Sequence, residues 1–96
     1  MAGFGIINYF KGGTAEMYEA VLATVHPDDG ASLPEGQTFH AAGPTVDGWV
    51  VIALWDGKAS WERFRDEKLM PGLAATEGAF EIPPEETTFD IHRQQS

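Results

Sequence analysis

The sequence predicts an α+β fold of the ferredoxin-like type, in the order βαββαβ, with a four-stranded antiparallel sheet and two helices on one face. Four segments rich in β-branched and aromatic residues alternate with two amphipathic segments in that order. An Asp-Gly pair joins the second and third strand segments as in a hairpin. The length of 96 residues and the absence of internal repeats predict one domain over residues 1–96.

The first half of the chain is predicted to be a strand, a helix and a loop. Residues 3–10 are apolar and aromatic and end at the turn sequence KGG. Residues 15–26 have apolar side chains at helical spacing, with Thr14 placed to cap the helix and Pro27 to end it. The polar segment 27–36 contains two prolines and two glycines, which predicts a loop.

The second half is predicted to be a hairpin, a helix and a final strand. Residues 36–44 and 49–55 form the hairpin, with a tight turn of positive φ at Asp47-Gly48. Residues 59–69 form the second helix, which Pro71 should kink or restart. Residues 85–93, which follow two prolines, form the fourth strand.

The third strand, residues 49–55, is apolar on both of its faces. A sheet in a small protein normally shows one polar face to water. We expect Val50, Ile52 and Leu54 to pack under the helices, which leaves the alternate residues, including two tryptophans, on a bare face. A second copy of the chain would cover that face, so the sequence predicts a homodimer.

Composition excludes several classes of partner. The chain has 6 Lys and Arg against 15 Asp and Glu, and this net charge of -9 disfavours nucleic acid and anionic membranes. Without cysteine there are no disulfides, thiolate metal sites or cysteine nucleophiles. No signal peptide and no apolar run of about 18 residues is visible, so we expect a cytoplasmic protein that binds a hydrophobic small molecule or another protein.

One segment of the chain is similar in sequence to a known family. It spans residues 33–64, with the sequence LPEGQTFHAAGPTVDGWVVIALWDGKASWERF. This segment, and the layout of nearly the whole chain, resembles the dimeric α/β-barrel superfamily and, within it, the small antibiotic biosynthesis monooxygenase-like proteins. The resemblance implies two ferredoxin-like subunits with their sheets face to face. It also implies an oxygenase without flavin, heme or metal, acting on a hydrophobic aromatic or polyketide-type molecule that becomes reactive once deprotonated.

Such chemistry needs a basic or polar group, hydrogen-bond donors and a dry apolar cavity. The candidate catalytic residues are His40, which titrates near neutrality in an apolar hairpin, and Asn8, on the first strand. Either two-residue turn, Val46-Asp47 or Asp47-Gly48, places His40 on the same face as Ala53 and Trp55. We expect this to be the face between subunits, together with Asp90, His92 and the tryptophans. The candidate substrate-binding residues are Tyr9, Trp55, Trp61, Phe64 and His92.

Structural explanations for the same residues stay open. His40 can be a hydrogen-bonded barrel histidine, Asn8 an amide bound to backbone, and Trp61 and Phe64 core side chains. Metal binding is not expected, because His and Asp lack ligand spacing, and heme degradation is disfavoured because the second helix has no histidine. The alternative function is a non-catalytic homodimeric barrel that binds an apolar ligand or serves an assembly, and a cavity filled by Trp and Phe side chains would favour it.

Overall fold

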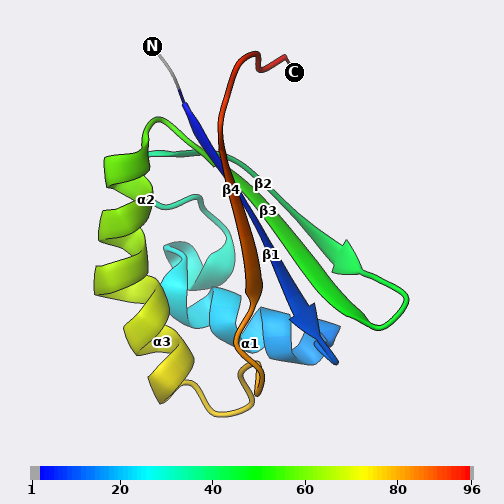
Figure 1. Ribbon diagram of the computed structural model, residues 1–96. Helices are drawn as coiled ribbons and strands as arrows, with labels where there is room; N and C mark the ends of the chain where they lie inside the picture. Colours follow the sequence, from blue (N-terminus) through cyan, green and yellow to red (C-terminus); the bar gives the residue numbers. More distant parts are fainter. Residues whose placement is uncertain (1–2, 96) are drawn as a thin grey trace.

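Four strands form one antiparallel sheet in the order β2-β3-β1-β4 in the computed structural model, which describes residues 3–95 (Figure 1). The predicted ferredoxin-like fold is confirmed, and all four strand segments are present. Their bounds are β1 Phe4–Lys11, β2 Gln37–Pro44, β3 Gly48–Trp55 and β4 Glu85–Asp90.

The helices all lie on one side of the sheet (Figure 1). They are α1 Ala15–Val25, the 3-10 turn η1 Asp28–Gly30, α2 Lys58–Phe64, the π-helical turn η2 Arg65–Leu69 and α3 Met70–Ala75. The predicted cap of α1 is present, since the backbone N–H of Met17 donates to the Thr14 hydroxyl at 3.3 Å. None of the helices in residues 3–95 combines the length and the apolar character needed to cross a bilayer.

The second helical segment continues past Pro71 by way of a π turn. The backbone N–H of Met70 donates to the carbonyl of Arg65, five residues earlier, which is the bond of a π-helix. Pro71 has no N–H to donate and its ring crowds the preceding turn. The wider turn accommodates the proline without ending the helix, so the helical segment continues to Ala75.

The β2–β3 hairpin has one of the two predicted turns, but without the predicted positive φ. The backbone N–H of Thr45 donates to the carbonyl of Gly48 at 2.9 Å, so the two-residue loop is Val46-Asp47. The predicted positive φ is wrong, because neither Asp47 nor Gly48 adopts it. Gly48 has another role: a Cβ there would lie 2.2 Å from the carbonyl oxygen of Phe10 on the neighbouring strand. Glycine is therefore required by close backbone approach, and not by the turn.

The prediction of which face of β3 the helices cover is also wrong. Trp49, Ala53 and Trp55 are buried on the helix side, whereas Val50 and the other alternate residues of β3 are only partly buried and face the other way. Alternation could not decide between the faces, since both are apolar. The large aromatic side chains lie on the side where helices supply a deep layer to fill.

Candidate active site

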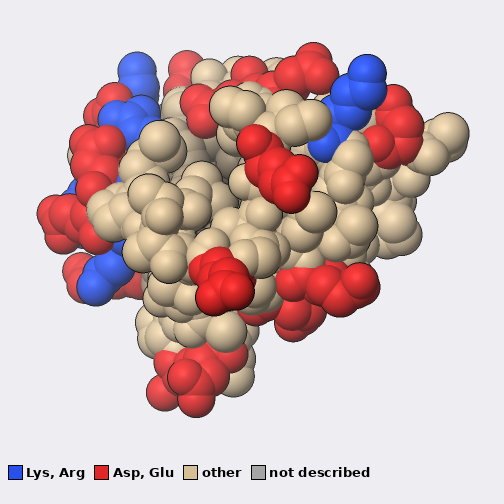
Figure 2. All heavy atoms as spheres, turned by 90° about the horizontal axis from the view of Figure 1, so that it is seen from below, with Lys and Arg blue, Asp and Glu red and all other residues tan. Residues whose placement is uncertain are grey.

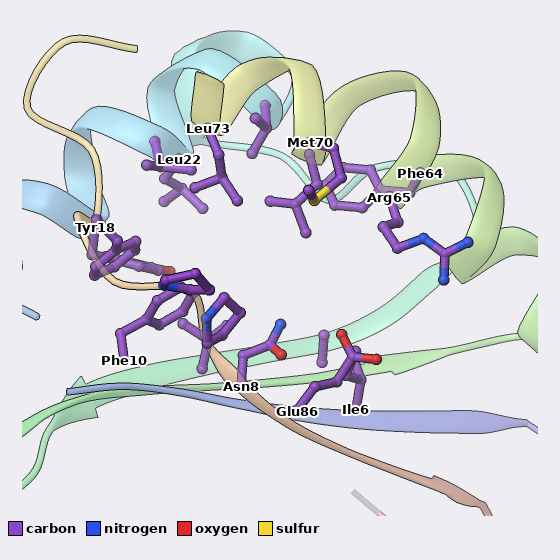
Figure 3. A pocket seen from close by; sticks show the side chains of 18 of the residues that line it. Ile6, Asn8, Phe10, Tyr18, Leu22, Phe64, Arg65, Met70, Leu73 and Glu86 are labelled. Atoms are coloured by element: carbon purple, nitrogen blue, oxygen red, sulfur yellow. The ribbon is translucent and has the colours of Figure 1, made fainter. Parts of the chain in front are cut away.

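A cavity of about 370 Å³ lies between the sheet and the helices (Figure 3). This volume is in the range of sites that hold small organic molecules. Its walls are mainly apolar and come from β1, β2, β3, all three α-helices, the π turn and the segment that precedes β4. Representative lining residues are Ile6, Val21, Leu22, Val51, Leu73 and Phe80.

Three predicted residues form an aromatic cluster against this cavity. The ring of Trp55 lies 5.8 Å from that of Trp61 and 5.1 Å from that of Phe64, between centroids. All three side chains are buried core residues and also line the cavity. They pack against one another and leave the volume open. A cavity filled by Trp and Phe would have favoured the non-catalytic alternative, and this is not what the structure shows.

His40 on β2 is hydrogen-bonded at both ring nitrogens. Its Nδ1 lies 3.0 Å from Oε1 of Gln37, and its Nε2 lies 2.5 Å from the hydroxyl of Tyr18 on α1. The amide oxygen of Gln37 can only accept, so Nδ1 carries the proton and Nε2 accepts from the Tyr18 hydroxyl. The three side chains form one hydrogen-bonded chain, Tyr18–His40–Gln37, in the wall of the cavity.

A second histidine lies against this chain. The ring of His26, at the end of α1, meets that of His40 edge-on at 4.8 Å between centroids. Burial, with repulsion from His40, lowers the pKa of His26 to about 4, and burial also lowers the pKa of His40. Burial raises the pKa of Tyr18. Near neutral pH the cluster therefore consists of two uncharged imidazoles and a protonated phenol, and Nε2 of His40 can accept a proton.

Asn8 extends from β1 into the cavity (Figure 3). The residue is 7% exposed, and its Oδ1 has no hydrogen-bond partner within residues 3–95. The indole nitrogens of Trp49 and Trp55 are likewise buried without a partner in that part of the chain. Buried polar atoms left unpaired cost about 1–3 kcal/mol each. Asn8 and Trp55 both line the cavity, so an unpaired acceptor and an unpaired donor belong to its wall.

Tyr9 and His92 lie away from the cavity. Tyr9 alternates with Asn8 along β1, so it faces the other side of the sheet, where its hydroxyl donates to Asp47. β4 ends at Asp90, and His92 is exposed beyond the strand. The expectation that His40 shares an inter-subunit face with Asp90 and His92 is wrong, because His40 pairs with Ala53 on the helix side.

Sequence reasoning missed three residues of the cluster: Tyr18, His26 and Gln37. Both Tyr18 and His26 lie in the helix predicted over residues 15–26, and helical spacing alone gives them no role beyond packing and position. One signal was available, since the phenol of a tyrosine on a buried face normally needs a polar partner. Nothing in the local pattern marks Gln37, the first residue of β2, which is 8% exposed.

Charged groups lie at the edge of the cavity. Arg65 of the π turn and Glu86 of β4 both line it, and Glu86 is paired with Asn8 in the sheet. The Arg65 guanidinium donates to Asp66 at 2.9 Å, which raises the pKa of Arg65. Figure 2 shows acidic side chains in several separate groups over one face of the molecule. Within residues 3–95 no three His, Asp or Glu side chains are grouped so that they could hold a metal ion.

Comparison with known proteins supports the fold. No family model matches the sequence, and no curated protein matches it by sequence. A Chloroflexus aurantiacus structure assigned as an antibiotic biosynthesis monooxygenase is similar at a TM-score of 0.68 and 13% identity, over 98% of this chain and 97% of that one.

Two structures of SnoaB, a cofactor-independent oxygenase from Streptomyces nogalater, are similar at a TM-score of 0.53. One is of a mutant, and their identities to this chain are 14% and 15%, over 99% of this chain and 95% of SnoaB. At such identities the similarity concerns the fold. This chain has a ferredoxin-like fold similar to that of the Chloroflexus aurantiacus structure and of SnoaB.

Proposed function

We propose that this protein is a small cofactor-independent oxygenase that acts on a hydrophobic aromatic molecule of the polyketide type. The observation that carries the proposal is the cavity of about 370 Å³, in which apolar walls meet the Tyr18–His40–Gln37 chain. The similarity in fold to SnoaB, described as a cofactor-independent oxygenase, supports the reaction type.

The proposed reaction begins with loss of a proton from the aromatic substrate. A methylene carbon between two aromatic rings loses a proton to the protein, and the resulting carbanion bonds to dioxygen. Return of the proton gives a hydroperoxide, which loses water as its O–O bond breaks and leaves a ketone. One methylene and one dioxygen thus give one carbonyl and one water, without an external reductant.

Each site residue has a proposed role in that reaction. His40 is the residue that takes up the proton, because its Nε2 is unprotonated. Asn8 offers its unpaired Oδ1 to a substrate hydroxyl. Trp55, Trp61 and Phe64 supply apolar contact and exclude water from the reacting carbon.

The test uses 1,8-dihydroxyanthrone as the probe. Oxygen consumption and the absorbance of the quinone product are followed with protein dialysed against a chelator, and with buffer alone to correct for spontaneous oxidation. We expect acceleration by the wild-type protein and a loss of about 100-fold in His40→Ala. No acceleration over buffer would contradict the proposal. Quenching of tryptophan fluorescence without turnover would instead support the non-catalytic binding protein.

We also propose that the purified protein is active without flavin, heme or stoichiometric metal. The absorption spectrum of the purified protein and metal analysis per chain test this directly. A visible absorption band, or one metal ion per chain that activity requires, would contradict it.

We propose further that the chain forms a homodimer through the sheet face opposite the helices. That face has Phe39 and Phe89, which are 45% and 41% exposed. Between them lie partly buried residues of β1 and β3: Ile7, Tyr9, Val50, Ile52 and Leu54. A contiguous apolar surface of this kind is typical of an interaction site.

A further inference from the structure

We infer that Tyr18 is the group that exchanges a proton with the molecule bound in the cavity, and that His40 acts through it. This inference rests on the proposed use of the cavity as a substrate site. It assigns a catalytic role to a residue of α1 and makes His40 a positioning and proton-holding residue.

The first argument is that His40 has no free ring nitrogen to offer. Nδ1 is occupied by Gln37 at 3.0 Å and Nε2 by the Tyr18 hydroxyl at 2.5 Å. An imidazole has one hydrogen-bonding position at each nitrogen, so a ligand cannot reach either without displacing a partner. A direct proton transfer from the ligand to His40 is therefore blocked by the arrangement of the site.

The second argument is that Tyr18 has a free position that faces the ligand. Its hydroxyl donates its one hydrogen to His40, and its oxygen keeps lone pairs that can accept from another group. Tyr18 lines the cavity and is only partly buried (Figure 3). Its ring is held by Trp49, at 5.3 Å between centroids, so the hydroxyl is fixed in direction.

The proton transfer is a relay of two protons and no electrons. The ligand X–H bond breaks and its proton bonds to the Tyr18 oxygen, while the original Tyr18 proton bonds to Nε2 of His40. The products are the ligand anion, a neutral tyrosine and a His40 imidazolium whose Nδ1–H still donates to Gln37. Because burial raises the pKa of Tyr18, a free phenolate is unfavourable, and a relay that never forms one avoids it.

Burial of His40 gives the relay its return step. The ring of His26 packs edge-on against that of His40 at 4.8 Å between centroids, and burial lowers the pKa of His40. A proton on His40 is therefore held weakly and passes back through Tyr18 once the ligand can accept it. The same cluster can thus act as base at the start of the reaction and as acid at its end.

A first experiment measures ionisation of a bound phenol without any oxidation. 4-Nitrophenol is the probe, its binding followed by quenching of tryptophan fluorescence and its ionisation by the absorption band of the phenolate. In the wild type we expect the Tyr18 hydroxyl to favour the bound phenolate. Tyr18→Phe should bind the un-ionised probe with little change in affinity. The pKa of the bound probe should rise by about one unit, because the hydroxyl that favours the phenolate is gone.

Tyr9→Phe is the matched control. Tyr9 is the only other tyrosine, and its hydroxyl lies on the opposite face of the sheet with Asp47 as its partner. This variant should ionise the probe as the wild type does. An equal effect of both variants, no effect of Tyr18→Phe, or no binding of the probe by the wild type would overturn the inference.

A second experiment uses oxidation of 1,8-dihydroxyanthrone. Tyr18→Phe and His40→Gln should each lose about 100-fold in rate, and the double variant should lose no more than either one, because the residues act as a unit. Losses that multiply in the double variant would overturn the inference. If Tyr18→Phe fails to fold, the oxidation rate of the wild type is measured in mixtures of light and heavy water. A curved dependence of the rate on the fraction of heavy water indicates that two protons move in the same step. A linear dependence would overturn the relay.

The two experiments separate this inference from the proposed function. A phenol whose ionisation depends on Tyr18, with no oxidation of the anthrone, would support the relay and contradict the oxygenase. Anthrone oxidation at a rate that Tyr18→Phe leaves unchanged would support the oxygenase and contradict the relay.

Discussion

Asn8 is a residue at which stability and function are opposed. The residue is 7% exposed and its Oδ1 has no partner in residues 3–95, so the folded chain carries the cost of an unpaired acceptor. We expect Asn8→Leu, of similar shape, to raise the free energy of unfolding by about 1 kcal/mol in urea titrations. The affinity for 1,8-dihydroxyanthrone, from fluorescence quenching, should fall by about tenfold. A less stable Asn8→Leu protein would show that the amide oxygen is paired in solution.

His26 makes stability depend on pH. Its pKa is lowered from 6.5 in the unfolded chain to about 4 in the fold, so the unfolded state binds the proton more readily. The stability it contributes is therefore complete above pH 6.5 and is lost as the pH falls toward 4. The full shift in pKa would correspond to about 3 kcal/mol in the free energy of unfolding. His26 also borders a second cavity, where solvent screens its charge, so we expect about 1–2 kcal/mol.

The measurement compares urea unfolding of the wild type and His26→Gln at about pH 7 and about pH 4.5. Glutamine cannot titrate, so the variant should lose less stability on acidification. His40, whose pKa burial also lowers, acts in the same direction but is present in both proteins. Equal losses in the two proteins would contradict the assignment to His26.

The central hairpin shows how one element depends on the backbone of another. Gly48 pairs with Lys11, and a Cβ on it would lie 2.2 Å from the Phe10 carbonyl oxygen. Gly48→Ala must separate β3 from β1, and we expect a loss of about 1–3 kcal/mol in the free energy of unfolding. Gly43→Ala in β2 is the control, because no atom lies within 4 Å of its added Cβ. Similar effects of the two substitutions would show that the close approach to the Phe10 carbonyl does not set the cost.

The whole molecule has two apolar faces on one sheet, and only one of them is covered by helices. The uncovered face has Ile52 near its centre, paired with Ile7 and Ala41. We expect sedimentation equilibrium at micromolar concentration to give twice the chain mass of 10.5 kDa. Ile52→Lys should weaken the dimer by at least about 100-fold, because it places a charge inside the interface. Val46→Lys, at the fully exposed hairpin tip, should leave the dimer intact. A wild-type monomer would contradict this assembly.

The amino-acid pattern alone determined the order of elements and which residues of the hairpin share a face. Period-two and helical spacing located each strand and helix, and either two-residue turn placed His40 on the same face as Ala53 and Trp55, as the structure has it. The two apolar faces of residues 49–55 were also visible in the sequence. These features are local, because each depends on residues close together along the chain.

Tertiary structure decided which face of the sheet meets the helices, and with it the composition of the candidate site. Alternation assigns residues to two sets but cannot say which set the helices cover when both are apolar. The approach of Tyr18 to His40, 22 positions apart, depends on where α1 crosses the sheet. Packing of whole elements sets that crossing, which is why the residue that completes the site lay outside the reach of any local pattern.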